Sequence, residues 1–450
     1  MTALLYLLGV VVFATAILAS IGLHELGHMI PAKKFGGKVT QYFIGFGPTV
    51  WSKQVGETEC GIKAIPLGGY VKIVGMLPPA AVDAADEVEV DADGNTVVKV
   101  RKSNTGMFTQ LISDARAAEW ETIRPEDTDR LFYKLTWWKK VVVMAGGPTV
   151  NLLIAFGIFA GVFATYGNTD DVRLGTTVSE VQGCIVPVEE DGRVCTAADP
   201  ESPAAKAGIK VGDRIVAFNG TRIDSWSQVQ QLIRANGDGV ARITVVRDGR
   251  EVALTPTPTT VTPRFLTDDA TTPTKVGFLG VSPTQTLATG GPLYTLQQMG
   301  KMTQHVVSSL ATLPVRVWGV ARAIVGLQQR DPNGPVSIVG GGRFAGEIGA
   351  SKSIDVQEKV IFLLMLIAGF NLFVGMFNFV PLLPLDGGHI ASALWEAVRR
   401  GIARLRRRPD PGYVDAAKLL PVAYVVASAL LVMGVVLIVA DFVVPVHIAS

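Results

Sequence analysis

The chain has few charged residues and few cysteines, and neither sign of charge is in large excess. Charged residues make up 18% of its 450 residues and the formal net charge is +2, so the composition does not favour nucleic acid binding. Three cysteines are too few for a disulfide framework or a cysteine metal site. The mean hydropathy of +0.36 is too high for an ordinary soluble protein. It indicates a membrane protein, and the length allows two or three domains.

Four apolar stretches are long enough to cross a lipid bilayer, which takes about 20 residues. They cover approximately residues 3–30, 141–165, 360–380 and 419–446. No basic region precedes the first stretch, and it is long for the apolar part of a signal peptide. We therefore expect it to be retained as a transmembrane helix.

Lysine and arginine are concentrated in two of the three segments that connect these stretches. The segment after the first stretch begins and ends with lysines, and the segment between the third and fourth is rich in arginine over 399–408. Because basic loops favour the cytoplasm, both termini and the long segment between the second and third stretches are predicted to be extracytoplasmic. The predicted location is the plasma membrane.

The run His24-Glu25-Leu26-Gly27-His28 lies inside the first apolar stretch. Residues four apart share one face of a helix, so His24 and His28 can reach one ion, with Glu25 close to a water on it. Short patterns recur by chance, but ionisable residues inside an apolar segment are costly and usually functional. The run therefore predicts a Zn²⁺ site with His24 and His28 as ligands.

The third apolar stretch ends in Asn378-Phe379-Val380-Pro381-Leu382-Leu383-Pro384-Leu385-Asp386-Gly387-Gly388-His389. Asp386 is the only ionisable residue between Lys359 and His389. A carboxylate in this setting needs a partner, and a zinc site with two histidines needs a third ligand. Two alternatives are that Asp386 caps the following helix and that His389 is the ligand. We favour Asp386 because the neighbouring prolines and glycines fix its setting.

Two other segments bear on the site. Residues 39–74 are rich in glycine, aromatic and β-branched residues, which predicts membrane-associated β-hairpins whose exposed edge could accept an extended peptide. An ordinary cytoplasmic hairpin has the same spacing. In the second stretch, Gly147-Pro148 is expected to break the helix locally. Asn151, the only amide there, is either a satisfied packing residue or part of the site.

Residues from about 172 to 261 read as a separate soluble unit. A short helix, a turn and a strand are expected over 202–220, a helix over 225–235, and a hairpin over 240–255 around Asp248-Gly249. This order resembles a PDZ domain, which implies a groove for an extended peptide or a chain end. Cys184 and Cys195 are predicted to form a disulfide there, with Cys60 reduced. A linker over 262–274 and an amphipathic segment over 294–327 follow.

The set of motifs resembles the bacterial site-2 protease family, most closely its actinobacterial members. The matching pieces are His24 to His28, Gly45-Phe46-Gly47-Pro48, Pro66-Leu67-Gly68-Gly69-Tyr70, Gly147-Pro148-Thr149-Val150-Asn151, the PDZ run, and Asn378 to Gly388. The resemblance implies zinc ligands His24, His28 and Asp386, with Glu25 as catalytic base and Asn378 handling the substrate backbone. Substrate contacts are accordingly expected at Asn378, Pro381, Pro384, Gly68, Gly69, Tyr70 and Asn151.

The fold class expected is a polytopic α-helical membrane protein with four transmembrane helices, membrane-associated β-hairpins and an inserted extracytoplasmic PDZ domain. The predicted segments are 1–77 (first helix and hairpins), 78–135 (cytoplasmic insert), 136–168 (second helix), 172–262 (PDZ domain), 263–357 (linker and amphipathic segment), 358–389 (third helix), 390–418 (basic loop) and 419–450 (fourth helix).

The resemblance implies a zinc metalloendopeptidase that cleaves transmembrane segments of single-span regulators such as anti-sigma factors, after their extracytoplasmic domains have been trimmed. The expected partners are these substrates, the lipid bilayer and a peptide or chain end in the PDZ groove, without nucleic acid. Two alternatives are a metal transporter, which has no use for a PDZ domain, and a non-catalytic PDZ scaffold, which has no need of Glu25.

Overall fold

The computed structural model describes residues 2–78, 88–90, 96–98, 110, 112, 114–115, 123, 125–187, 193–196, 198–265 and 272–447. The chain forms two compact units, Met1–Val162 with Gly291–Ser450, and Phe163–Gly290. The predicted insert 78–135 lies largely outside the described residues up to η1 (Pro125–Arg130) and η2 (Phe132–Lys134), apart from the short pair β3 (Val88–Val90) and β4 (Thr96–Val98).

Among the described residues, four helices are long and apolar enough to cross a membrane, as predicted. They are α1 (Thr2–Lys34), α3 (Trp137–Thr165), α8 (Val356–Asn378) and α10 (Leu420–Val443), the last preceded by η4 (Ala416–Leu419). The predicted break at Gly147-Pro148 is wrong, because α3 continues through Pro148. A proline removes one helical hydrogen bond, and the packing of Gly146 against Gly27 of α1 supports the helix at this point.

A β-sheet follows α1. It consists of β1 (Val39–Val55) and β2 (Thr58–Ile73), which are joined by a tight turn. The predicted hairpin is therefore present. Each strand bends midway and so contributes two extended segments, which we call rows. The rows lie in the order 65–73, 39–46, 58–63 and 49–55, and Phe43 pairs with Tyr70 on one side and with Gly61 on the other. Gly45, with a φ of 93°, permits one bend, since a left-handed φ suits glycine. The row 65–73 is therefore an edge of the sheet.

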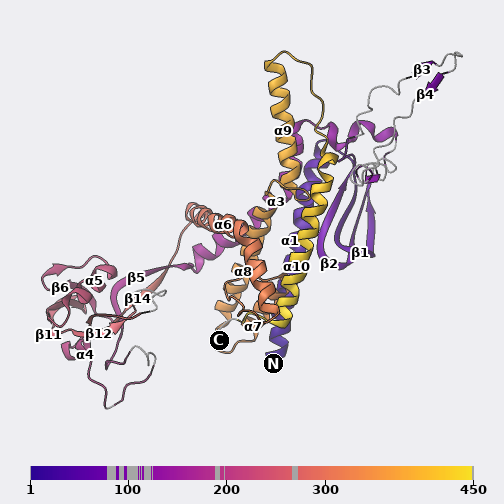
Figure 1. Cartoon of the computed structure of the whole chain (residues 1–450). Coiled ribbons are helices and arrows are strands. Elements are labelled where there is room, and N and C mark those ends of the chain that lie inside the picture. The colour runs from indigo at the N-terminus through magenta and orange to yellow at the C-terminus, as the bar shows by residue number, and fades with distance from the viewer. Residues whose placement is uncertain are drawn as a thin grey trace. The chain divides into compact units, whose positions relative to one another are not determined.

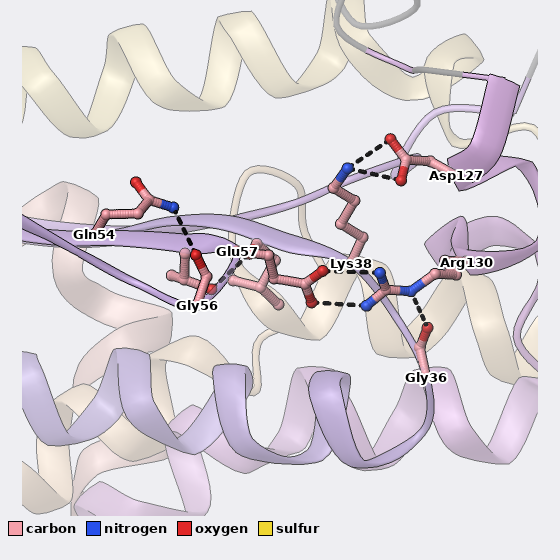
Figure 2. A network of polar contacts seen from close by, with 9 residues as sticks. Gly36, Lys38, Gln54, Gly56, Glu57, Asp127 and Arg130 are labelled. Atoms are coloured by element: carbon pink, nitrogen blue, oxygen red, sulfur yellow. Dashed lines mark hydrogen bonds and ion pairs between the residues drawn. The ribbon is translucent and has the colours of Figure 1, made fainter.

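Ion pairs fasten the tight turn and the start of this sheet to the segment before α3 (Figure 2). Arg130 donates from both terminal nitrogens to the Glu57 carboxylate at 2.7 and 2.8 Å, and from Nε to the Gly36 carbonyl at 3.3 Å. Lys38 Nζ lies 2.7 Å from both oxygens of the buried Asp127. Hydrogen bonds from Arg130 hold the pKa of Glu57 below its usual value. These contacts tie η1 to both ends of the hairpin.

The second unit is built on an antiparallel sheet in the order β10-β9-β6-β5-β14. The elements are β5 (Asn168–Val181), α4 (Pro203–Ala207), β6 (Arg214–Phe218), β7 (Thr221–Arg222), α5 (Trp226–Asn236), β8 (Val240–Ala241), β9 (Ile243–Arg247), β10 (Arg250–Ala253), β11 (Thr257–Pro258), β12 (Thr260–Arg264), β13 (Thr274–Phe278) and β14 (Val281–Ala288). The predicted short helix, strand, longer helix and hairpin are all present. The unit is longer than predicted, because β14 returns to pair with β5.

Cys184 and Cys195 are bonded to each other, with their Cα atoms 5.9 Å apart, and Cys60 is free. The predicted disulfide is confirmed. The segment predicted as the linker 262–274 instead includes the end of β12 and the start of β13, which pair with each other. The structure does not describe residues 266–271 between them.

Three helices complete the first unit: α6 (Pro292–Ile324), α7 (Ile338–Ala350) and α9 (Asp386–Leu405). α6 corresponds to the predicted amphipathic segment, whereas α9 occupies much of the predicted basic loop. α7 lies beside the first half of α1, and the start of α1 and the end of α10 both lie near it (Figure 1). A Cβ atom on Gly349 would lie 2.8 Å from the Leu5 carbonyl oxygen, so small residues let the two backbones approach.

Candidate metal centre

The two histidines of α1 converge on one point. His24 and His28 are one helical turn apart, and their Nε2 atoms lie 3.2 Å from each other. Their rings are nearly perpendicular, with an interplanar angle of 80°. The spacing within the sequence therefore produces the shared face that was predicted.

Asp386 comes to the same point from the start of α9. Its Oδ2 atom lies 3.4 Å from His24 Nε2 and 3.3 Å from His28 Nε2. No side chain makes a capping hydrogen bond at the start of α9, so Asp386 does not cap this helix. Glycine is required next to it, since a Cβ atom on Gly387 would lie 2.6 Å from the Phe379 carbonyl carbon.

Hydrogen bonds at the far side of each imidazole set its orientation. His28 Nδ1 donates to the Val143 carbonyl oxygen at 2.8 Å, and His24 Nδ1 lies 3.1 Å from Oδ1 of the buried Asn151. A ring that donates through Nδ1 leaves Nε2 unprotonated in its neutral form. Both Nε2 lone pairs and the Asp386 carboxylate therefore face the same point, as the ligands of a cation do.

The donor set fits zinc. A tetrahedral site with bonds of about 2.0 to 2.1 Å places its ligand atoms about 3.3 to 3.4 Å apart, close to the 3.2, 3.4 and 3.3 Å seen here. Gly147 of α3 keeps this point open, because a Cβ atom on it would lie 2.7 Å from His24 Nε2 and nearer still to His28 Nε2. Within the described residues, His24, His28 and Asp386 form a group able to hold a metal, and His389 is not part of it.

The three side chains lie in a cavity of about 690 Å³ that also contains Glu25. The edge row of β2 forms part of its wall: a Cβ atom on Gly69 would lie 3.0 Å from Cγ of Glu25, and Val71 of the same row also lines the cavity. The sheet edge and a carboxylate next to the metal point are thus in direct contact.

Most of the remaining predicted site residues line this same cavity. These are Gly68, Gly69, Tyr70, Asn151, Asn378 and Pro384. Pro381 is exposed and lies outside the lining. Asn371, seven residues before Asn378, is buried and donates to Ser20 Oγ at 3.1 Å, which holds α8 against α1.

Several contributing residues were not singled out from the sequence. Val143 contributes a main-chain carbonyl, which any residue type supplies, so no sequence signal marks it. The crossing of α1 and α3 depends on Gly27 and Gly146, where a Cβ atom on Gly27 would lie 2.6 Å from the Gly146 carbonyl oxygen. Two small residues in separate apolar stretches are a signal for such a crossing.

Two imidazoles and a carboxylate around one point, with a second carboxylate in the same cavity, define a metal-dependent hydrolase site, carried by helices able to cross a membrane. The sequence profile described as "Peptidase family M50" matches residues 12–409. The chain therefore belongs to peptidase family M50.

Several similar proteins are named zinc metalloproteases. The zinc metalloprotease Rip1 of Mycolicibacterium smegmatis is 36% identical over 454 residues, with 98% of each chain covered. Rip1 of Mycobacterium tuberculosis is 33% identical over 458 residues, with 99% of each chain covered. The zinc metalloprotease RasP of Geobacillus kaustophilus is 28% identical over 414 residues, covering 84% of this chain and 86% of that protein. The chain is thus a membrane-embedded zinc metallopeptidase.

Proposed function

We propose that the protein is an intramembrane endopeptidase in which His24, His28 and Asp386 hold zinc and Glu25 is the catalytic base. The observation that carries the proposal is the set of three ligand atoms 3.2 to 3.4 Å apart, in one cavity with Glu25. When bound, zinc supplies Lewis acidity toward a water molecule and toward the carbonyl of the scissile peptide.

Glu25 takes the proton of the attacking water and later delivers it to the leaving amine. Its position supports this role, because Glu25 lines the cavity of the three ligands and packs against Gly69 of the sheet edge. Asn151 keeps Nδ1 of His24 protonated and so keeps Nε2 available. This role for Asn151 differs from the substrate contact expected from the sequence, although Asn151 also lines the cavity.

The substrate is an apolar segment that must unwind, because the carbonyls of a helix are already hydrogen-bonded. The edge row 65–73 supports binding of the unwound segment as an added strand. Among the described residues it pairs with a strand on one side only, and several of its residues line the cavity. Pro66 within the row fits an edge position. Asn378, at the end of α8 in the cavity wall, is placed to bond freed peptide groups of the substrate.

The unit Phe163–Gly290 acts in this proposal as a PDZ domain. A cavity of about 320 Å³ lies between α5 and the start of β14, the end strand of the sheet. Arg234 and Arg264 line it beside apolar residues, which suits an extended peptide or a chain carboxylate. The unit would exclude substrates that still carry a bulky domain, so the substrates are single-span regulators such as anti-sigma factors after trimming.

The proposed orientation places both termini and this unit outside the cytoplasm, with the basic segments inside. The start of α1 and the end of α10 lie near the same helix, α7, which is consistent with termini on one side. The segment boundaries predicted from the sequence remain part of the proposal, with the inserted unit extended to 163–290.

The test is cleavage of a tagged single-span protein by the purified full chain in detergent, with zinc content measured on the same samples. Glu25→Gln should retain zinc and lose about 10²-fold or more of the cleavage rate. His24→Ala should lose the zinc as well. Glu358→Gln, an exposed carboxylate at the start of α8, is the matched control. Cleavage that survives Glu25→Gln at full rate contradicts the assignment.

A further inference from the structure

A second cavity adjoins the catalytic cavity. It has a volume of about 400 Å³ and lies between α1 and α7, with Pro66 of β2 and Phe442 of α10 at its margins. We call it the α1–α7 groove, bounded by residues 6–18 of α1 and 338–343 of α7. Apart from one residue its described lining is apolar or glycine.

The groove and the catalytic cavity share part of their lining. Pro66 and Ile338 line both. On α1 the lining positions recur every three or four residues from Tyr6 to Leu18, and the same face continues to His28. A chain that occupies the catalytic cavity can therefore follow one face of α1 into the groove.

The exception to the apolar lining is Arg343 of α7. Within the part of the chain that the structure describes, its guanidinium has no ion pair or hydrogen bond. Nearby carboxylates are already engaged: Glu347 lies 2.7 Å from His447 Nδ1, and Asp441 lies 3.0 Å from Arg330 Nη2. Arg343 is half-buried among these apolar side chains, where a charge is costly unless it meets an anion.

We propose that the α1–α7 groove holds the uncut part of the substrate's apolar segment, and that Arg343 pairs with an acidic side chain on it. This inference rests on the proposed function. It adds a specificity site, because a bidentate guanidinium–carboxylate pair in an apolar setting favours substrates that carry the acid. The lining that the groove shares with the catalytic cavity favours a peptide over a lipid as the occupant.

The distance between Arg343 and Glu25 predicts how far the acidic residue of the substrate lies from the scissile bond. Gly342, next to Arg343, faces Val10 and Phe13 of α1, which precede Glu25 by about 12 to 15 residues, or roughly 20 Å along a helix. An extended chain covers that distance in about six residues, and a helical one in about thirteen. The acidic residue is therefore expected about six to thirteen residues from the scissile bond, toward the end of the substrate that lies beside the start of α1.

The first experiment measures kcat/KM of the full chain on a tagged single-span protein with glycines at the centre of its apolar segment. One form is neutral, and others carry a single Glu at successive positions from the glycines. The wild type should prefer the best Glu form about tenfold or more over the neutral form. Arg343→Gln should bring this ratio to about one. Arg343→Glu should prefer a Lys at that position. Arg316→Gln, an exposed arginine on α6, should keep the wild-type ratio.

A second readout does not depend on turnover. In the Glu25→Gln background, a photo-crosslinking residue at Ala14, which lines the groove, should capture the substrate. The same residue at Val12, which is exposed and outside the lining, should not. Arg343→Gln should lower capture of the Glu form.

The outcomes separate the two proposals. Cleavage that depends on Glu25, with an unchanged substrate ratio in Arg343→Gln, overturns the groove and leaves the peptidase. Capture of phospholipid alone from Ala14 overturns the groove in favour of a lipid site. Absence of any Glu25-dependent cleavage, with zinc bound, overturns the proposed function itself.

Discussion

Lys140 Nζ lies 2.7 Å from Glu396 Oε2 in a buried ion pair that joins α3 to α9. α3 carries Gly147 at the metal point, and α9 begins at Asp386. The pair therefore fixes the relative position of two helices that both reach the candidate zinc centre.

Removing one partner of this pair should cost stability and zinc together. Lys140→Met leaves Glu396 buried with Arg400, at 3.2 Å, as its remaining ion-pair partner, and the loss should be about 3 kcal/mol. The double variant Lys140→Met/Glu396→Leu should recover part of it, because it also removes the buried carboxylate that has lost its shorter ion pair. Thermal unfolding in detergent and zinc content are the measurements. Lys139→Met is the control, and equal unfolding temperatures for both lysine variants contradict the prediction.

Gly147→Ala should abolish metal binding without unfolding the protein. The new methyl group would occupy space at the Nε2 atoms of His24 and His28, while alanine favours a helix more than glycine does. Zinc content per protein and the circular dichroism spectrum test this. Gly157→Ala, in the same helix with open space around it, should keep its zinc. A zinc-loaded Gly147→Ala protein would refute the assignment of the site.

Gly69→Ala should slow cleavage and keep the metal. A methyl group there would lie 3.0 Å from Cγ of Glu25 and 2.9 Å from the Phe43 carbonyl oxygen, so the base or the sheet edge must shift. Displacement of a reacting group by about 1 Å can cost roughly 10²-fold in rate. The comparison is turnover against zinc content, with Gly369→Ala, which has open space on α8, as the control. Wild-type turnover would mean that Glu25 does not need this contact.

The second unit should lose stability in acid through Asp213. This buried carboxylate accepts from Arg247 Nε and Nη2, each at 2.7 Å, and from the Lys210 amide at 2.8 Å. The Arg247 hydrogen bonds lower the pKa of Asp213 from its usual value. The stabilisation is therefore fully present above the unfolded pKa of about 3.9 and is lost as pH falls through the lower folded value. Hydrogen exchange of β6 and β9 between pH 5 and pH 2 measures it, and Asp213→Asn should flatten the pH dependence. Parallel profiles for the two proteins would exclude this carboxylate as the cause.

The grouping of the three candidate metal ligands was predictable because their signals are local or nearly unique. His24 and His28 follow from a spacing of four, and Asp386 from being the single ionisable residue in a long apolar run. The orientation of the imidazoles was not predictable. It depends on Val143 and Asn151, which reach the histidines only because two backbones cross at glycines.

The sequence also predicted the paired strands of 39–74 but not their bends. Since Phe43 has a partner on each side, the sheet edge that faces the cavity depends on where β1 and β2 fold back. α7 was missed altogether, because its glycines weaken any helical signal while favouring close packing on α1.

The first and last residues of the inserted unit lie next to each other. The Gly290 amide donates to the Phe163 carbonyl at 3.1 Å, and Asn168 pairs with Ala288. Its ends are therefore adjacent, and a short connection could replace the whole unit without rethreading the membrane helices. This arrangement makes the unit exchangeable as a module: the unit to which we assign substrate screening can change while the helices of the candidate metal centre keep their sequence.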